Sequence, residues 1–188
     1  MQDVIINATV TALREGRTIL YPTDTIWGIG CDAGNAEAVE RIYAIKERDH
    51  GKSMLVLVSE AMLSADLPEA ARELLLRSGR PTTVVLPAGL VAAPLAGNLP
   101  AADGTVGVRV PRFDFCQRML GELGRPVVST SANLSGRPSP ARYEDIEKEV
   151  RQRVDYVLPD DESFHHPDVG SSRIVKLLLD GSIVTLRG

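Results

Sequence analysis

The fold of this chain is decided by the stretch Tyr21-Pro22-Thr23-Asp24-Thr25-Ile26-Trp27-Gly28-Ile29-Gly30. Residues 18–21 predict a buried strand, Pro22 a sharp turn, and residues 27–32 a second strand. The hydroxyl groups of Thr23 and Thr25 belong to the turn, and the glycines after it would let a ligand approach the backbone. The stretch therefore predicts two strands joined by a hydroxyl-rich turn.

The rest of the sequence predicts alternating helices and strands around this unit. Helices are expected over residues 7–16, 35–47, 68–77, 113–124 and 143–151, with Asn35 capping the second. Further strands are expected over residues 54–58, 83–86, 106–110, 126–129, 154–158, 173–177 and 182–186. Residues 87–104, rich in Ala, Gly and Pro, are expected to form a long surface connection that could act as a lid. We predict one α/β domain over residues 1–188, with a twisted, mixed parallel and antiparallel sheet flanked by helices.

Size and composition indicate an ordinary globular protein. The 188 residues are enough to bury a core without disulfides or a structural metal, and 44% of them are hydrophobic. No apolar run approaches the roughly 20 residues that span a bilayer. The N-terminus carries no basic segment followed by an apolar one, so the sequence predicts a soluble, cytoplasmic protein without a membrane partner.

The charge balance limits how nucleic acid could be bound. A formal net charge of −4 argues against a protein whose whole surface binds nucleic acid, because that mode needs a broad basic face. A local basic groove remains open, since positive residues fall in or beside the motif segments: Lys46, Arg48, Lys52, Arg109 and Arg137.

Cysteines and familiar phosphate motifs give mainly negative information. Cys31 and Cys116 are far apart and have no metal-ligand spacing, so both are expected to be reduced packing residues. Neither a Gly-x-x-x-x-Gly-Lys-Ser/Thr loop nor a Gly-x-Gly-x-x-Gly after a strand is present. Any nucleotide must therefore be held in another way.

Lys46 and Arg48 are the first candidates, at the C-terminus of a predicted helix and just past it. A lysine beside a forked arginine suits the oxygens of a polyphosphate, both the reacting phosphate and the departing pyrophosphate. The plainer alternative is a pair of solvated cations, which are common at helix C-termini.

A second hydroxyl cluster, Ser129-Thr130-Ser131-Ala132-Asn133-Leu134-Ser135-Gly136, could supply the opposite wall of the same pocket. Its hydroxyls, the Asn133 amide and its backbone N–H groups could contact phosphates or a hydrated Mg²⁺. The alternative is an Asn/Ser/Gly loop without a special role.

Taken together, these segments resemble the YrdC/TsaC family of threonylcarbamoyl-adenylate synthases over nearly the whole chain. The pieces that carry the resemblance are Tyr21 to Gly30, Lys46-Glu47-Arg48, Thr83-Val84-Val85-Leu86, Thr105-Val106-Gly107-Val108-Arg109-Val110-Pro111, Ser129 to Gly136, Ser171-Ser172-Arg173-Ile174-Val175-Lys176-Leu177 and Leu186-Arg187. Several pieces in the same order are more specific than any one of them.

The resemblance implies a YrdC-like fold and a nucleotidyltransferase reaction. L-threonine, bicarbonate and ATP would give threonylcarbamoyl-AMP and pyrophosphate, with Mg²⁺ held through the ATP phosphates and no protein metal ligand. The product would pass to the tRNA threonylcarbamoyl-transferase machinery that modifies adenosine 37.

Roles for individual residues also follow from the resemblance. The catalytic set around ATP would be Lys46, Arg48, Ser131 and Asn133. Further nucleotide contacts would be Thr105, Ser139 and Arg187. The threonine side would be Thr23, Arg109, Ser129 and Ser172.

Two departures from the family pattern put local geometry in question. Arg80 lies where the family usually has Pro-Gly-Pro-x-Thr, and Arg173 takes a place commonly held by threonine. The histidines, His50, His165 and His166, are expected to be loop residues without a catalytic role. The rival function is a paralogue that binds double-stranded RNA or tRNA through a basic concave surface; the retained Lys-x-Arg and Ser-x-Asn sets favour the synthase.

Overall fold

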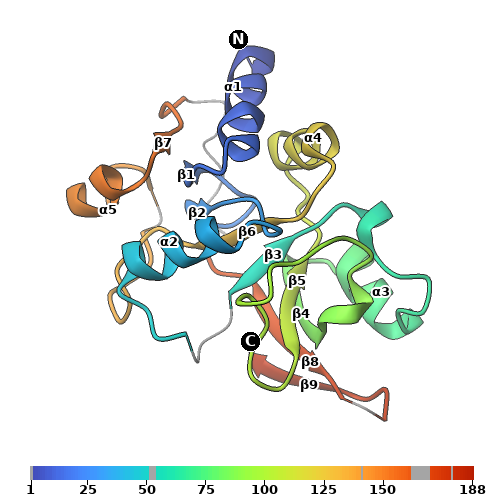
Figure 1. The fold of residues 1–188 in the computed structure, drawn as a ribbon. Helices are drawn as coiled ribbons and strands as arrows, with labels where there is room; N and C mark the ends of the chain where they lie inside the picture. The colour runs from blue at the N-terminus through green and yellow to red at the C-terminus, as the bar shows by residue number, and fades with distance from the viewer. Residues whose placement is uncertain (1, 51–53, 141, 162–169, 179) are drawn as a thin grey trace.

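A mixed sheet forms the centre of the molecule (Figure 1). The structure is a computed structural model that describes residues 2–50, 54–140, 142–161, 170–178 and 180–188. Within these residues, nine strands follow the order β7-β1-β2-β6-β3-β5-β4-β8-β9. Their bounds are β1 Ile19–Tyr21, β2 Gly28–Gly30, β3 Leu55–Leu57, β4 Thr82–Pro87, β5 Thr105–Arg109, β6 Val127–Ser131, β7 Tyr156–Val157, β8 Arg173–Leu177 and β9 Ile183–Arg187. The prediction of an α/β fold with a mixed sheet is confirmed.

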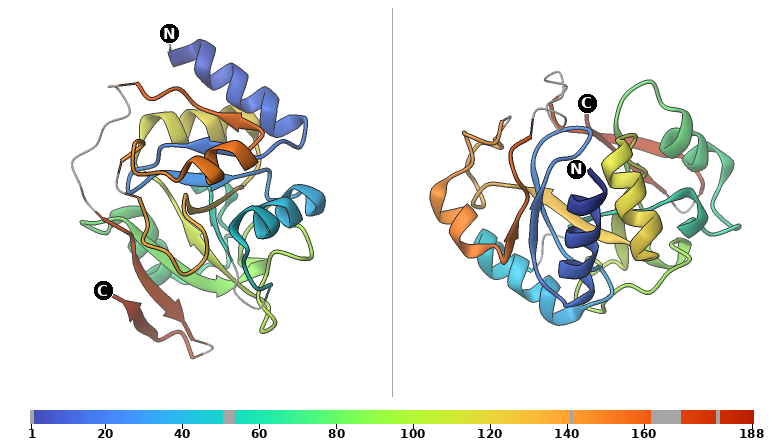
Figure 2. Two further views of the ribbon diagram at one scale, coloured as in Figure 1. Left: turned by 90° about the vertical axis from the view of Figure 1, so that its left-hand side faces the viewer. Right: turned by 90° about the horizontal axis from the view of Figure 1, so that it is seen from above.

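Helices surround this sheet, and two of them pack directly on each other. Their bounds are α1 Gln2–Arg14, α2 Ala36–Lys46, α3 Glu69–Arg77, α4 Asp114–Leu123 and α5 Lys148–Arg153. Helices α1 and α4 lie side by side in the view from above (Figure 2). None of the helices in the described part of the chain is long and apolar enough to cross a membrane.

The quoted stretch forms an antiparallel pair, as its pattern predicts. Strand β1 pairs with β2 so that Ile19 faces Gly30 and Tyr21 faces Gly28. At Gly30 a side chain is excluded, because a Cβ atom there would lie 2.4 Å from the Val128 carbonyl oxygen and 2.7 Å from the Tyr21 ring. The glycine therefore allows β6 to pack closely beside the hairpin.

Strand β6 joins the two halves of the sheet and explains the position of the second hydroxyl cluster. It pairs antiparallel with β2, where Gly28 faces Ser131, and with β3, where Leu55 faces Ser129. Ser131, from the second hydroxyl cluster, thereby lies beside Gly28 at the end of the β1–β2 turn.

Most predicted elements are confirmed, including the Asn35 cap, whose side-chain oxygen accepts a hydrogen bond from the Ala38 N–H at 3.0 Å. The prediction for residues 7–16 misses the start of α1, which begins at Gln2. The helix expected over residues 143–151 is also wrong at its start: α5 begins at Lys148, and turns hold the residues just before it. Both cysteines are buried and free, as expected, and burial raises the pKa of each thiol.

Residues 87–104 form the expected long surface connection between β4 and β5, and a few buried residues anchor it. Val91 and Leu99 are buried, and the Ala96 N–H donates to the Ala33 carbonyl at 2.7 Å. The segment is held against the body of the protein because it is apolar as well as glycine-rich. From Ala88 to Gly104, no described residue lines the cavity discussed below, and a role of this segment as a lid stays a prediction.

Candidate functional site

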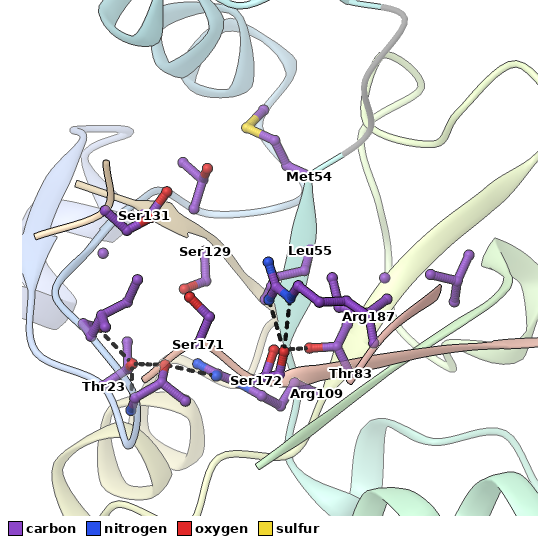
Figure 3. A pocket seen from close by; sticks show the side chains of 18 of the residues that line it. Thr23, Met54, Leu55, Thr83, Arg109, Ser129, Ser131, Ser171, Ser172 and Arg187 are labelled. Atoms are coloured by element: carbon purple, nitrogen blue, oxygen red, sulfur yellow. Dashed lines mark hydrogen bonds between the residues drawn. The ribbon is translucent and has the colours of Figure 1, made fainter. Parts of the chain in front are cut away.

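A cavity of about 360 Å³ lies among the β1–β2 turn, the end of β6 and the β8–β9 pair (Figure 3). This volume is within the range of about 300–1,000 Å³ that is usual for ligand pockets. Most of the residues with predicted roles line it: Thr23, Arg48, Arg109, Ser129, Ser131, Ser139, Ser172 and Arg187. Segments that are remote in sequence therefore converge on one hollow.

The charged side chains that line this cavity, among the described residues, are all positive. Its described lining contains Arg48, Arg109 and Arg187 and no carboxylate. Burial lowers the pKa of Arg48, but an arginine stays protonated at neutral pH. Three fixed cations with hydroxyl groups between them suit a ligand that carries several negative charges.

Arg109 forms the floor of the cavity and is held from two sides. Its Nη1 donates to the Thr25 hydroxyl at 2.9 Å, and its Nη2 lies 3.3 Å from Asp24 Oδ1. Its Nε has no hydrogen-bond partner among the described residues, although the side chain is only 4% exposed. Arg109 thus lines the cavity with two of its nitrogens held by the protein and one buried N–H without a partner among the described residues.

The β8–β9 pair supplies the opposite wall. Arg187 donates from Nε and Nη2 to the Ser172 carbonyl at 3.2 and 2.8 Å. The Ser172 hydroxyl lies 2.9 Å from that of Thr83. Arg187 thus ties the end of β9 to the beginning of β8 beside the cavity.

The unusual Arg173 does not disturb this wall. Ser172 and Ile174 line the cavity, whereas Arg173 does not and instead donates to the Thr185 hydroxyl at 3.1 Å. Successive strand residues point to opposite faces, so Arg173 lies on the far side of β8. Arg80 is exposed and also lies outside the lining.

Lys46, Asn133 and Thr105 have predicted roles but do not line the cavity. The Lys46 ammonium is 2% exposed and donates to the Ser131 and Asn133 carbonyls at 2.5 and 2.7 Å. Asn133 Nδ2 donates to the Leu134 and Arg137 carbonyls. All of these contacts hold the loop after β6 in place through residues that do not line the cavity.

Thr105 is engaged elsewhere, because its hydroxyl donates to Asp103 Oδ1 at 2.6 Å. Asp103 also pairs with Lys176 at 2.8 Å. The Lys176 contact, followed by the Thr105 bonds, lowers the pKa of Asp103 to about 2. The contacts of Thr105 thus stabilise the start of β5 rather than the cavity wall.

Lys46 and Arg48 diverge because of the residue between them. Glu47 adopts a left-handed conformation with φ 50° and ends α2. The turn sends Lys46 into the protein and leaves Arg48 at the cavity. The sequence pattern alone cannot show this, because Lys-x-Arg says nothing about the conformation of x.

The buried environment of Lys46 predicts a pH effect on stability. Burial, and then the nearby Arg48 charge, lower the Lys46 pKa from 10.5 to about 8. Between these values the unfolded chain binds more protons at this lysine than the folded one, so rising pH stabilises the folded state. We expect the free energy of unfolding of the wild type, relative to Lys46→Met, to rise from pH 8 to pH 10.5. Denaturant titrations across this range test it; a relative stability that is constant or falls with pH would contradict the lowered pKa.

Several groups beside the motifs take other partners. His50 stacks on Tyr43 and its Nε2 lies 2.8 Å from Glu40, outside the cavity lining. Arg137 pairs with Glu147 at 2.7 Å. The predictions for Lys52, His165 and His166 lie outside the described residues. Within the described ranges, no group of three His, Cys, Asp or Glu residues is placed to hold a metal ion.

Thr25, Thr83 and Ser171 also line the cavity, although no role was predicted for them. Thr83 and Val85 are two positions apart on β4, so their side chains share one face of the strand, and both line the cavity. This two-residue spacing is the sequence signal that points to Thr83. Thr25 belongs to the hydroxyl-rich turn that the sequence indicates, but the pattern gives it no role of its own.

The sequence is similar to a family of known proteins over most of its length. The Sua5_yciO_yrdC family model, described as telomere recombination, matches residues 11–188. A threonylcarbamoyl-AMP synthase from Vibrio vulnificus is 30% identical over 94% of this chain and 98% of its own length. A threonylcarbamoyl-AMP synthase from Bacillus subtilis is 32% identical, and the match covers 81% of this chain and 45% of the Bacillus protein.

Solved structures agree. P. abyssi Sua5 complexed with L-threonine has a TM-score of 0.80 and 27% identity; the match covers 100% of this chain and 54% of that protein. E. coli YciO has a TM-score of 0.75 and 25% identity, over 100% of this chain and 89% of its own. The chain described here therefore belongs to the Sua5/YciO/YrdC family.

Proposed function

We propose that this protein is an L-threonylcarbamoyladenylate synthase. It joins L-threonine, bicarbonate and ATP, and it releases pyrophosphate. One observation carries the proposal: Arg48, Arg109 and Arg187 line the same cavity as the hydroxyl groups of both motif clusters. No carboxylate is found among the described residues that line it. Relatives named for this activity, and one solved with L-threonine, support it.

The proposed chemistry needs alignment more than a protein nucleophile. The threonine amine and bicarbonate form a carbamate with loss of water, and a carbamate oxygen attacks the α-phosphorus of ATP while the bond to pyrophosphate breaks. Both reactants are anions, so cations and hydroxyl donors that hold them in line lower the barrier. No covalent enzyme intermediate is required.

We assign the two ends of the cavity to the two substrates. Arg109, with Thr23, Ser129 and Ser172 nearby, binds the threonine, and the available Nε of Arg109 meets its carboxylate. The ATP side consists of Arg48, Ser131, Ser139 and Arg187. Lys46, Asn133 and Thr105 remain predicted nucleotide residues; their contacts support a role through the loops that they fix.

The remaining partners follow from the chemistry. Mg²⁺ would be bound through the ATP phosphates, which offer the oxygen ligands that it prefers. The mixed anhydride would pass to a tRNA-modifying transferase, which places the reaction in the cytoplasm. Direct tRNA contact by this chain belongs to the rival RNA-binding hypothesis.

Product formation tests the proposal. With ¹³C-bicarbonate, the purified protein should yield labelled threonylcarbamoyl-AMP and an equal amount of pyrophosphate only when threonine and ATP are also present. Mass spectrometry and a pyrophosphate assay measure the two products. Pyrophosphate release that does not depend on threonine or bicarbonate would refute the synthase activity. Salt-sensitive binding of double-stranded RNA by a protein that forms no product would also refute it.

A further inference from the structure

The turn between β1 and β2 contains a chain of hydrogen bonds that starts at Arg109 (Figure 3). Arg109 Nη1 donates to Thr25 Oγ1 at 2.9 Å. Thr25 Oγ1 lies 2.9 Å from Thr23 Oγ1, and Thr23 Oγ1 donates to the Ile26 carbonyl at 2.8 Å. Two hydroxyl groups therefore connect the arginine at the cavity floor to the backbone of the turn.

When all of these hydrogen bonds form together, only one set of directions is possible. A guanidinium can only donate and a carbonyl oxygen can only accept. Because the single proton of Thr23 goes to Ile26, the proton between the two hydroxyls must come from Thr25. In that arrangement Thr25 accepts from Arg109 and donates to Thr23.

This arrangement leaves little capacity in the Thr23 hydroxyl for a ligand. It accepts from the Thr25 hydroxyl and from the Thr25 N–H at 3.1 Å, and it donates to Ile26. One donor and two acceptor positions are all that a hydroxyl offers. The charged donor beside it is Arg109, whose Nε has no hydrogen-bond partner among the described residues.

Arg109 depends on its neighbours to present that group. Its side chain is 4% exposed, and it contacts Asp24 on one side and Thr25 on the other. Asp24 supplies the charge balance, whereas Thr25 supplies a directed acceptor that fixes the guanidinium plane. Loss of that acceptor would leave a buried N–H without a partner and free the plane to rotate.

We propose that Thr25 is a positioning residue for L-threonine: through its hydroxyl it orients Arg109 for the substrate carboxylate, without contributing to the ATP side. The inference rests on the proposed function and assigns a role to a residue outside the set predicted from the sequence.

The experiment compares Thr25→Val with Thr25→Ser as its matched control. Valine keeps the branched shape and removes the hydroxyl, and serine keeps the hydroxyl. Calorimetry measures the Kd of L-threonine and, separately, of ATP. Because the lost hydrogen bond involves a charged group, we expect Thr25→Val to weaken threonine binding about tenfold. ATP binding should be unchanged in both variants, and Thr25→Ser should bind threonine like the wild type.

Other outcomes would overturn the inference. Unchanged threonine affinity in Thr25→Val would show that Arg109 needs no help from Thr25. Equal weakening of threonine and ATP, or a serine variant as weak as the valine one, would show that Thr25 only shapes the cavity. If Thr25→Val fails to fold, Thr25→Ala removes the same hydroxyl and is judged by the same criteria. A wild type that binds no threonine would refute the proposed function itself, and is recognised without any variant.

Discussion

Replacement of Arg109 by methionine is expected to abolish threonine binding and to destabilise the fold. Arg109 and Asp24 form an ion pair at 3.3 Å with side chains only 4% and 10% exposed. Removing one partner of such a pair leaves a buried, uncompensated charge, which costs about 3–5 kcal/mol of unfolding free energy. Chemical denaturation measures the stability, and calorimetry the threonine affinity.

The double variant Asp24→Asn/Arg109→Met separates the two effects. It removes both charges, so most of the lost stability should return, while threonine binding should stay absent because the cation that meets the carboxylate is missing. Asp24→Asn alone serves as the second control, since it keeps the guanidinium. A double variant that regains threonine binding together with stability would show that Arg109 is structural and that the carboxylate is bound elsewhere.

Local patterns were sufficient to predict most of the fold. The strand before Pro22, the Asn35 cap and the helix that ends at Gly124 each depend on nearby residues, and each lies where it was expected. What local patterns do not predict has tertiary causes. The composition of residues 87–104 predicts their surface connection, but it does not show that Val91 and Leu99 anchor this connection in the core.

The site was predicted as a set of residues rather than as a geometry. The convergence of the two hydroxyl clusters depends on the pairing of β6 with β2, where Gly28 faces Ser131, and no local pattern encodes that register. The divergence of Lys46 from Arg48 depends on one left-handed residue, Glu47. The hydrogen bond from Arg109 to Thr25 joins residues far apart in the sequence, and no local pattern predicts it.

Because Arg48 lies at the cavity while Lys46 is buried, we expect Arg48→Ala to lose activity without losing stability. Arg48 lines the cavity on the ATP side, where its charge would offset that of the departing pyrophosphate. Removing one such preorganised donor typically costs about 100-fold or more in turnover. The pyrophosphate assay should show a loss of this size, with an unfolding midpoint close to that of the wild type, because Arg48 is not part of the buried core. Arg77→Ala is the matched control, since its side chain is 76% exposed on α3 and should leave both quantities unchanged. If Arg48→Ala kept nearly full activity, the phosphates would have to be bound by Arg187 and the hydroxyl groups alone, and the proposed ATP side of the cavity would need to be redrawn.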